Sequence, residues 1–365
     1  MANTPVTTHD VTVYNATPKV RIDSQSNDTA NAQLLAMEVR ETEGGLTSAE
    51  VRFSNFGTFS DHTANLVFED NRILKLGAKL ELLAGDQTSQ TSIFEGKISA
   101  LEGRFTNNAP PELVVLAEDP LQAARLKRRT KLHDNVTLSD VLQSIATDLG
   151  MTLSADGLDE NIGTQLQLNE TDLGFARRLL ARYDSDMYMD GATLHAGKRA
   201  NIQRSQIEMD YDSGKLRHAR VLADLAHQVT KVTYSGWDFQ QGAVASAERQ
   251  DNPPAPGAGR HGQQTLQDAF GERTEQLSTF TARNDTEAQA LVDAEYQQRS
   301  RRFVTLYGTS EGNAAIRVGT HVKVGGLGQR FSNTYYVTAA LHRFDQERGY
   351  ETDFTAECAF LGDAA

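Results

Sequence analysis

Two distant segments of this chain repeat one pattern of turn and strand residues. Residues 76–82 read LGAKLEL and residues 318–324 read VGTHVKV, so each copy places a glycine before alternating apolar and polar residues. A glycine turn that leads into such an alternation is typical of the start of a β-strand. A second strand is expected in each copy, ISALEGRF at 98–105 and VTAALHRF at 337–344, and these two segments align without gaps.

The spacing of the two strands decides how this repeat is interpreted. Any two β-hairpins share some alternation, so the pattern by itself is weak evidence of duplication. The turn glycine precedes the second strand by 21 residues in the first copy and by 18 residues in the other, in the same order. We therefore favour a chain with two similar β domains. Three such chains would give a closed ring of six similar units, which fits a threefold partner on one face and a sixfold partner on the other.

The first 118 residues predict the first β domain. Short segments rich in valine, isoleucine, leucine and phenylalanine alternate with turn residues, a texture shared by sandwiches and barrels. The expected strands are residues 12–22, 34–41, 49–56, 79–84, 92–105 and 113–117.

Residues 119–205 predict a small α/β domain. Apolar residues at helical spacing predict a helix over 138–149, with a capping signal at Thr137 and Asp140 and a glycine stop at Gly150. The further elements expected here are a helix after Asn169 and a hairpin with strands at 187–189 and 193–196.

Residues 206–365 predict the second β domain. Residues 250–264, QDNPPAPGAGRHGQQ, are rich in proline and glycine and nearly lack apolar side chains, so we expect a long mobile loop. The other expected elements are strands at 207–211 and 228–235, a helix at 285–302 after a cap at Asn284, and strands from 303 to 360. The predicted fold class is β-rich α+β, with two β domains flanking a small α/β domain.

Charge and cysteine content exclude several classes of function. The 49 acidic and 36 basic residues leave a net charge of −13, which disfavours general nucleic-acid binding and adhesion to anionic membranes. One cysteine, Cys358, excludes a disulfide or a thiolate metal site within the chain and favours a reducing compartment. The first residues resemble no signal peptide and no stretch approaches the ~20 apolar residues of a membrane span, so we expect assembly in a cytosol.

The motifs that could carry chemistry lack the context that each requires. GAGRHG at 257–262 matches a dinucleotide-binding pattern but lies in the expected loop, and GATLHAGKR at 191–199 fits a hairpin and turn better than a phosphate loop. We interpret two groups of aspartates as solvated turn residues rather than calcium ligands, because neither has the complete calcium loop. These groups are Asp184, Asp186 and Asp190, and Asp210 and Asp212.

No catalytic, cofactor-binding or metal-binding residue is therefore predicted, and no cofactor. Histidines do not occur at zinc-ligand spacing, and His342 in the repeated strand is expected to be a packed or interface residue. Trp237, the single tryptophan, is expected to anchor a domain core or a domain junction.

A basic run lies near the start of the expected α/β domain. Arg125, Lys127, Arg128, Arg129 and Lys131 give five basic residues in seven. Such a run could touch nucleic acid passing by, or it could form a solvated or partner-facing strand paired with acidic residues. The second interpretation is favoured on a protein this acidic, and a subunit boundary suits the arginines.

Four stretches in order carry a resemblance to a known family. They are ILKLGAKLELLAG to IFEGKISALEGRF (73–105), RLKRRTKLHDNVTLSDVLQSIATDLGM (125–151), LNETDLGFARRLLARYDSDMYMDGATLH (168–195) and VGTHVKVGGLGQRFSNTYYVTAALHRFDQERGYETDFTAE (318–357). The sequence resembles the late control protein D family of phage tails. These are baseplate hubs, related to the hub region of spike proteins in type VI secretion and extracellular contractile injection systems.

The resemblance implies a fold, partners and a place. It implies two tube-protein-like β-barrel domains around the α/β domain, and a homotrimer that joins the sixfold tail tube to a threefold spike. The spike would be a separate polypeptide, and baseplate wedge and tape-measure proteins are further candidate partners. We expect a non-enzymatic component of a virion tail baseplate or an injection-particle tip, assembled in a bacterial host. A tail-associated glycan-binding module or a peptidoglycan-degrading enzyme is the alternative.

Overall fold

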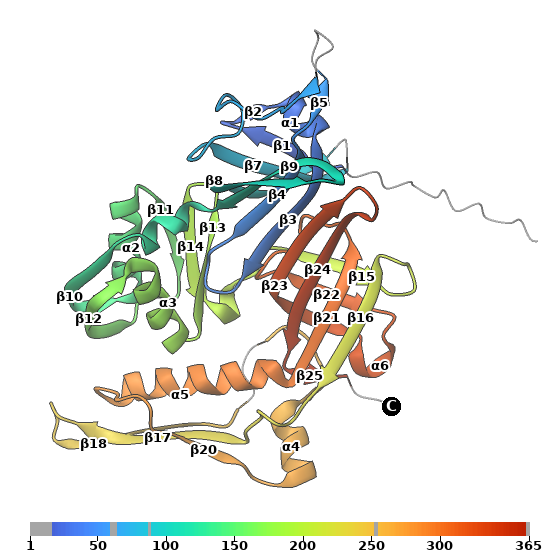
Figure 1. Ribbon diagram of the computed structural model, residues 1–365. Helices are drawn as coiled ribbons and strands as arrows, with labels where there is room; N and C mark the ends of the chain where they lie inside the picture. The colour runs from blue at the N-terminus through green and yellow to red at the C-terminus, as the bar shows by residue number, and fades with distance from the viewer. Residues whose placement is uncertain (1–16, 59–63, 87–88, 252–254, 363–365) are drawn as a thin grey trace, which may run out of the picture.

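The computed structural model describes residues 17–58, 64–86, 89–251 and 255–362, and its largest element is one long β-sheet (Figure 1). Parts of two expected features, strand residues 12–16 and loop residues 252–254, lie outside the described residues. The fold is β-rich with a minority of helix, as the sequence predicts.

The first strand set lies within the first 118 residues. Five of its strands coincide closely with the expected ones, and a five-residue helix, α1 (Asp28–Ala32), follows the first. The set consists of β1 (Lys19–Ile22), β3 (Leu34–Thr42), β4 (Ser48–Ser54), β7 (Lys79–Asp86), β8 (Ser89–Thr106) and β9 (Ala109–Glu118).

A second strand set repeats this arrangement after residue 205. It consists of β15 (Gln206–Asp210), β16 (Leu216–Ala223), β21 (Val304–Glu311), β22 (His321–Gly325), β23 (Asn333–Asp345) and β24 (Gly349–Cys358). In space the first set runs β3-β4-β9-β8-β7-β1 and the second runs β16-β21-β24-β23-β22-β15. Each strand therefore has the same rank in the chain and the same neighbours as its counterpart. The final pair differs, because β1 is antiparallel to β7 whereas β15 is parallel to β22.

The strand registers agree as closely as the order. Ile98 and Val337, aligned by the repeat, each precede a β-bulge at which the pairing with the next strand shifts by one residue. The turn glycines Gly77 and Gly319 have φ of 81° and 87°, and each N–H donates to the carbonyl of the aligned strand residue, at 2.8 and 2.9 Å. A second bulge recurs after Leu34 in β3 and after Leu216 in β16. The sequence repeat is thus a repeat of topology.

The two sets join into one open sheet rather than closing as two separate barrels. Strand β23 is long enough to pair with β22 through its first residues and with β3 through its second half. The edge strand of the first set thereby pairs with the second set. Over the residues that the structure describes, the 13-stranded sheet that results ends at β16, at β2 (Gln25–Ser26) and, on a side branch through β22, at β15. No strand among the described residues closes it into a barrel, so the expected pair of barrels needs this correction.

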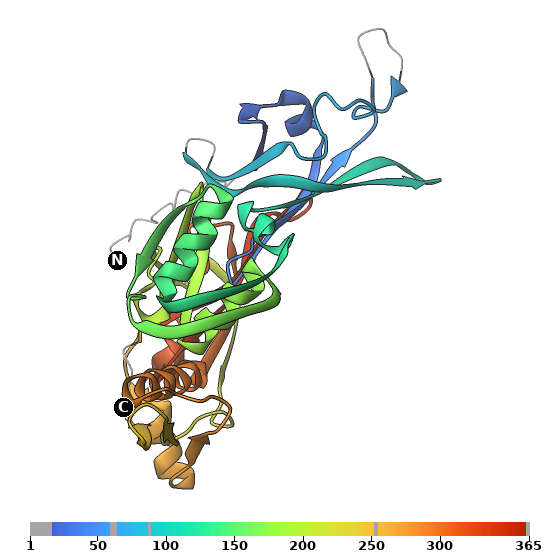
Figure 2. The same ribbon diagram turned by 90° about the vertical axis from the view of Figure 1, so that its left-hand side faces the viewer.

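The middle unit, residues 119–205, carries two helices beside small sheets (Figure 2). Helix α2 (Leu138–Leu149) has the predicted capping box of Thr137 and Asp140, and Gly150 ends it in the left-handed conformation. The other elements are the 3-10 turn η1 (Pro120–Arg125), β10 (Arg128–Thr137), β11 (Thr152–Asp156), β12 (Asn161–Thr171), α3 (Asp172–Arg182), β13 (Ser185–Asp190) and β14 (Thr193–Lys198).

A long insertion separates β16 from β21, where the first set has only a short turn between β3 and β4. Helix α5 (Asp285–Ser300) begins at the predicted Asn284 cap and lies along a three-stranded sheet (Figure 1). The sheet consists of β17 (Lys231–Asp238), β18 (Ala243–Arg249) and β20 (Thr274–Leu277).

The insertion corrects two expectations about residues 206–365. Its apolar side chains share one core with α2 and α3, so much of 229–296 packs with the middle unit and not with the second strand set. The expected loop 250–264 also ends early. β19 (Arg260–His261) pairs with β25 (Phe360–Leu361), and α4 (Gly262–Phe270) begins at once, because Leu266 supplies a buried apolar anchor beyond the proline-rich part.

Candidate functional site

The joint between the two strand sets is the first structural feature to consider for function. Seven consecutive residue pairs link β23 to β3, from Ala339 with Thr42 to Asp345 with Ala36. Phe344, only 9% exposed, packs into the core of the first strand set together with Tyr350. Backbone pairing and a shared core therefore make one rigid joint, which we call the seam.

A buried carboxylate strengthens the seam. Glu41 of β3 accepts from Arg204 at 2.5 Å and from Arg317 at 2.6 Å, and its side chain is 4% exposed. Burial by itself would raise the pKa of Glu41, but the charges of Arg317 and Arg204 outweigh it and lower the pKa to about 2. Three separate segments are thus held by one charged group.

A second charged cluster joins the seam to the middle unit. Arg199 contacts Glu43, donates to Glu357 at 3.2 Å, and lies 4.2 Å from the ring centre of Tyr336. Asp184 contacts Arg301 in the same region. Arg199 and Asp184 are almost fully buried. Ion pairs of such buried groups fix one arrangement of segments, because each partner left alone would be costly.

The aspartates of the possible calcium group are therefore not solvated turn residues, and that prediction is wrong for two of them. Asp184 is 7% exposed and Asp186 is 6% exposed. Asp186 accepts from the backbone N–H of Gly44 at 2.8 Å, and burial together with nearby Glu43 raises its pKa to about 6. Asp190 lies in the exposed hairpin turn, and Asp210 accepts from the N–H of Asp212 in a turn, as expected. No group of side chains in the described ranges has the arrangement of a metal site.

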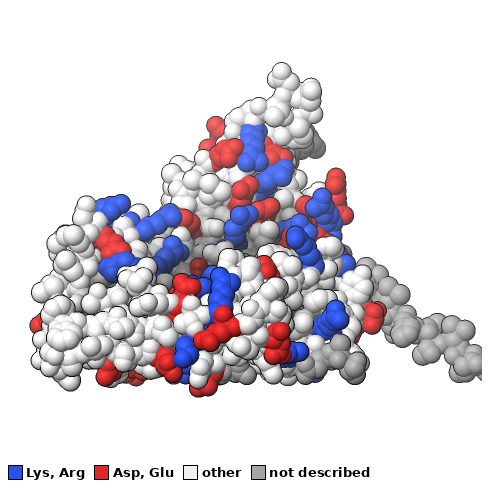
Figure 3. Space-filling model, turned by 90° about the horizontal axis from the view of Figure 1, so that it is seen from below, with Lys and Arg blue, Asp and Glu red and all other residues white. Residues whose placement is uncertain are grey.

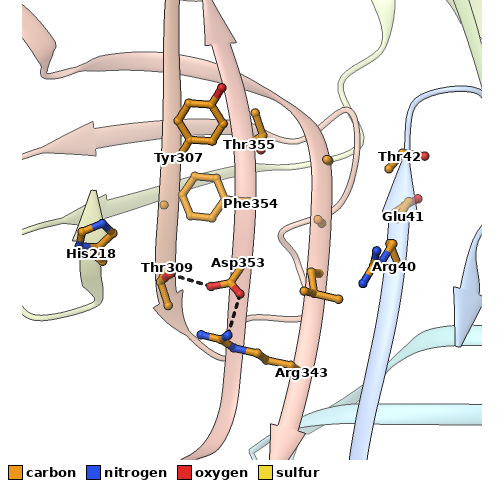
Figure 4. Close-up of a pocket in the computed structure, with 14 residues that line it drawn as sticks. Arg40, Glu41, Thr42, His218, Tyr307, Thr309, Arg343, Asp353, Phe354 and Thr355 are labelled. Atoms are coloured by element: carbon orange, nitrogen blue, oxygen red, sulfur yellow. Dashed lines mark hydrogen bonds and ion pairs between the residues drawn. The ribbon is translucent and has the colours of Figure 1, made fainter. Parts of the chain in front are cut away.

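A shallow groove of about 520 Å³ lies on the open face of the sheet across the seam (Figure 4). Arg343 of β23 binds Asp353 of β24 at 3.1 Å, and Asp353 accepts from Thr309 of β21 at 2.6 Å. His218 of β16 and Arg40 of β3 border the groove on either side. The polar groups bind one another across strands, which suits a surface that contacts a partner more than one that performs chemistry.

Two strand edges carry unpaired backbone. Within the described part of the chain, β16 pairs with β21 on one side only, and the second half of β8 pairs with β9 on one side only. Apolar side chains are exposed along both, with Phe105 at 67% and Leu222 at 46%. The β8–β9 hairpin also projects beyond the rest of the sheet (Figure 2). Open edges with exposed apolar residues are sites of strand addition unless something covers them.

The remaining residues singled out in the sequence have structural roles. His342 is fully buried with Nδ1 2.8 Å from the Tyr350 hydroxyl, and burial lowers its pKa to about 3, so it is a packed histidine as predicted. Cys358 is a buried free thiol. The 257–262 motif leads into β19, and the 191–199 motif forms β14 and a turn, as the hairpin interpretation predicts.

Two residues of the basic run pair with acidic residues, which supports the favoured interpretation. Arg125 contacts Glu118, and Arg129 binds Asp148 at 2.7 Å and Asp172 at 3.0 Å. Figure 3 shows basic and acidic side chains intermixed on the face seen from below, without the single-sign stripe that a nucleic-acid track needs.

Trp237 does not anchor a core, so that prediction is wrong. It lies on β17 opposite Val244 of β18, and it is 48% exposed. Phe239 in the following turn is 84% exposed. The sequence does not indicate that Trp237 is exposed, because the residues around it also fit a buried strand.

Structural comparison relates the whole described fold to tail proteins. The 43 kDa tail protein of prophage MuSo2 from Shewanella oneidensis has a TM-score of 0.66 at 11% identity, over 93% of this chain and 98% of that one. A tail protein from Neisseria meningitidis MC58 has the same TM-score and identity, over 94% and 97%. A type VI secretion component from Escherichia coli, described as similar to the bacteriophage T4 tail proteins gp27 and gp5, has a TM-score of 0.57 at 12% identity, over 95% and 79%.

These likenesses at low identity establish the fold, and this fold agrees with the resemblance to phage-tail proteins that the sequence motifs indicated. None of the curated proteins matches the sequence. No helix among the described residues has the length and apolar character of a membrane span. The sequence matches the family described as Alg8 N-terminal domain over residues 14–346. That match covers most of the chain, which therefore belongs to the Alg8 N-terminal domain family.

Proposed function

We propose that this protein is a structural hub at the tail tip or baseplate of a contractile injection machine, and that it acts as a trimer. The duplication of the strand set carries the proposal. Six similar units arise when three chains close into a ring, and such a ring matches a sixfold tail tube on one face. The other face seats a threefold spike, which we propose to be a separate protein.

The seam supports this role because it shows how two units join. The two sets of one chain meet head to tail, the edge strand of one pairing with the long strand of the other. A joint of this heterologous kind continues until a ring closes. Each tube-protein-like unit would then contribute strands to a wall around a central channel.

The buried charges support a mechanical role without chemistry of its own. Glu41 and Arg199 are both almost fully buried, and each joins segments more than 100 residues apart. Ion pairing lowers the pKa of Glu41 and raises the pKa of Arg199, in both cases against the effect of burial. These buried ion pairs make the structure rigid, as a part that transmits force during contraction requires. Assembly in a bacterial host before incorporation into the particle fits the buried free thiol.

Light scattering coupled to size exclusion tests the trimer. We expect a species of three times 40.1 kDa, and class averages from electron microscopy should show a ring with six similar lobes. Mixing with hexameric rings of the tail tube protein from the same particle should give a stable stacked complex. A monomer at tens of micromolar, or a trimer that never binds tube rings, would contradict the proposal.

A further inference from the structure

We infer that β16 of one chain pairs antiparallel with the second half of β8 of a second copy, in a register that the seam specifies. The inference rests on the proposed ring and adds to it the two surfaces that meet and the residues that lie opposite each other. The occupant of both open edges is thus a second copy of this chain.

The seam is the template. In it, the first-set edge strand β3 pairs with the second half of β23 so that Leu341 lies opposite Arg40 and Phe344 lies opposite Met37. Strand β16 is the counterpart of β3, because both follow the first strand of their set and both carry the same bulge. Strand β8 is the counterpart of β23, because the sequence repeat and the bulges align them residue by residue.

Transferring the register gives a specific set of opposite residues. From the pairing within the two sets, position 40 in β3 corresponds to position 222 in β16, and position 341 in β23 corresponds to position 102 in β8. Glu102 of one copy therefore lies opposite Leu222 of the next. The other pairs are Gly103 with Val221, Arg104 with Arg220, Phe105 with Ala219 and Thr106 with His218.

The exposure of Phe105 supports this joint independently of the register. Its counterpart Phe344 is buried by the seam, at 9% exposed, whereas Phe105 is 67% exposed in the single chain. On β16, Ala219 and Val221 are partly buried side chains that pack against the core of the second strand set. That surface can receive Phe105 as the first-set core receives Phe344. Burial of a phenylalanine contributes roughly 2 kcal/mol or more to such a joint.

One charge pair in this register is unfavourable at first sight. Arg104 lies opposite Arg220, whereas the template has Arg343 opposite Glu38. Arg104 is, however, 2.8 Å from Glu102 and 3.9 Å from Glu50. These two carboxylates balance the positive charges of Arg104 and of the Arg220 that faces it from the next copy. The local charge of the joint is therefore balanced.

Cysteine cross-linking in the full-length chain tests the register. Opposite residues on antiparallel strands have Cα atoms about 4.5–5.5 Å apart, which a disulfide spans. The double variant E102C/L222C should form covalent dimers and trimers on mild oxidation, with the closed trimer dominant on a non-reducing gel. The single variants E102C and L222C should give no ladder, since Cys358 is buried.

The matched control moves one cysteine by two residues on the same face. R104C/L222C places the cysteines diagonally, beyond the Cα separation of about 7 Å that a disulfide tolerates. It should cross-link at least about 10-fold more slowly. Equal cross-linking of both pairs, or cross-linking of the control alone, would overturn the register.

The outcomes separate this inference from the proposed function. A trimer by light scattering that gives no E102C/L222C cross-link would leave the hub standing and refute the β16–β8 joint. A chain that stays monomeric at tens of micromolar would refute both.

A second pair of variants tests the edge without cysteines. F105S should weaken trimer formation about 10-fold or more, while F239S, which removes an aromatic of similar exposure outside the joint, should not. Circular dichroism would verify that both variants are folded. Equal weakening by the two variants, or none by F105S, would count against the inference.

Discussion

Phe105 of β8 and Phe344 of β23 occupy the same position in the two strand sets, yet one is 67% exposed and the other 9%. The difference follows from what lies beside each strand. β3 covers the second half of β23, and no described strand covers the second half of β8. One position in a duplicated fold therefore has two environments within a single chain.

Removing the two phenylalanines should separate folding from assembly. F344A should lower the free energy of unfolding by about 3–5 kcal/mol at any protein concentration, because it opens a cavity in a packed core. F105A should cost less than about 0.5 kcal/mol in dilute protein and progressively more as assembly sets in. Urea unfolding at several protein concentrations measures both. A concentration-independent loss in F105A would argue that Phe105 is a folding residue.

Replacing Arg220 by glutamate should tighten the trimer. R220E restores at the proposed joint the opposite charges found at the seam, where Glu38 faces Arg343. We expect a gain of about 0.2–1 kcal/mol per joint, decreasing with salt. Sedimentation at two ionic strengths measures the change. Weaker assembly in R220E at low salt would contradict the predicted register.

Neutralising Glu41 should destabilise the seam severely. E41Q leaves the guanidinium groups of Arg204 and Arg317 buried without their shared carboxylate, at an expected cost of about 3–5 kcal/mol in the free energy of unfolding. E38Q, on the same strand but with an exposed side chain, should cost less than about 0.5 kcal/mol. Chemical denaturation of both variants compares them, and similar losses would show that Glu41 is not the central ion of the seam.

The part of the stability that depends on Asp119 should fall as pH rises from about 4 to 7. Burial outweighs the hydrogen bonds that Asp119 accepts from the N–H groups of Thr47 and Leu121, and it raises the pKa of Asp119 from 3.8 to about 7. The native state then holds a proton that the unfolded chain has lost, so unfolding becomes easier as pH rises. Asp119 alone contributes about 1.4 kcal/mol per pH unit in this range. D119N should reduce this slope in thermal or urea unfolding, and an unchanged slope would exclude Asp119 as its source.

Features fixed by neighbouring residues could be predicted from the sequence. The limits of α2 depend on Thr137, Asp140 and Gly150, which lie within one short segment and act through local backbone geometry. The repeat could also be aligned, because alternation and turn glycines survive when the side chains diverge. The pairing registers of β7 with β8 and of β22 with β23 agree with that alignment residue by residue.

Features fixed by distant residues could not be predicted. Asp184 and Asp186 look like turn aspartates until Arg301 and Gly44, more than 100 residues away, bury them. The insertion packs on the middle unit because its apolar residues contact α2 and α3. No local sequence pattern predicts this contact. The sequence does not predict strand β16 either. It is an edge strand whose exposed arginines and histidine hide the alternation.

The insertion between β16 and β21 occurs in only one of the two strand sets, since β3 and β4 are joined by residues 43–47 alone. A ring of three chains would therefore carry three such arms on six otherwise equivalent positions, at every second place around its circumference. The change from sixfold to threefold order would then need no separate adaptor, because the chain already alternates plain and elaborated copies of one strand set. Deleting residues 224–303 would remove that alternation while leaving the strands of the wall in place.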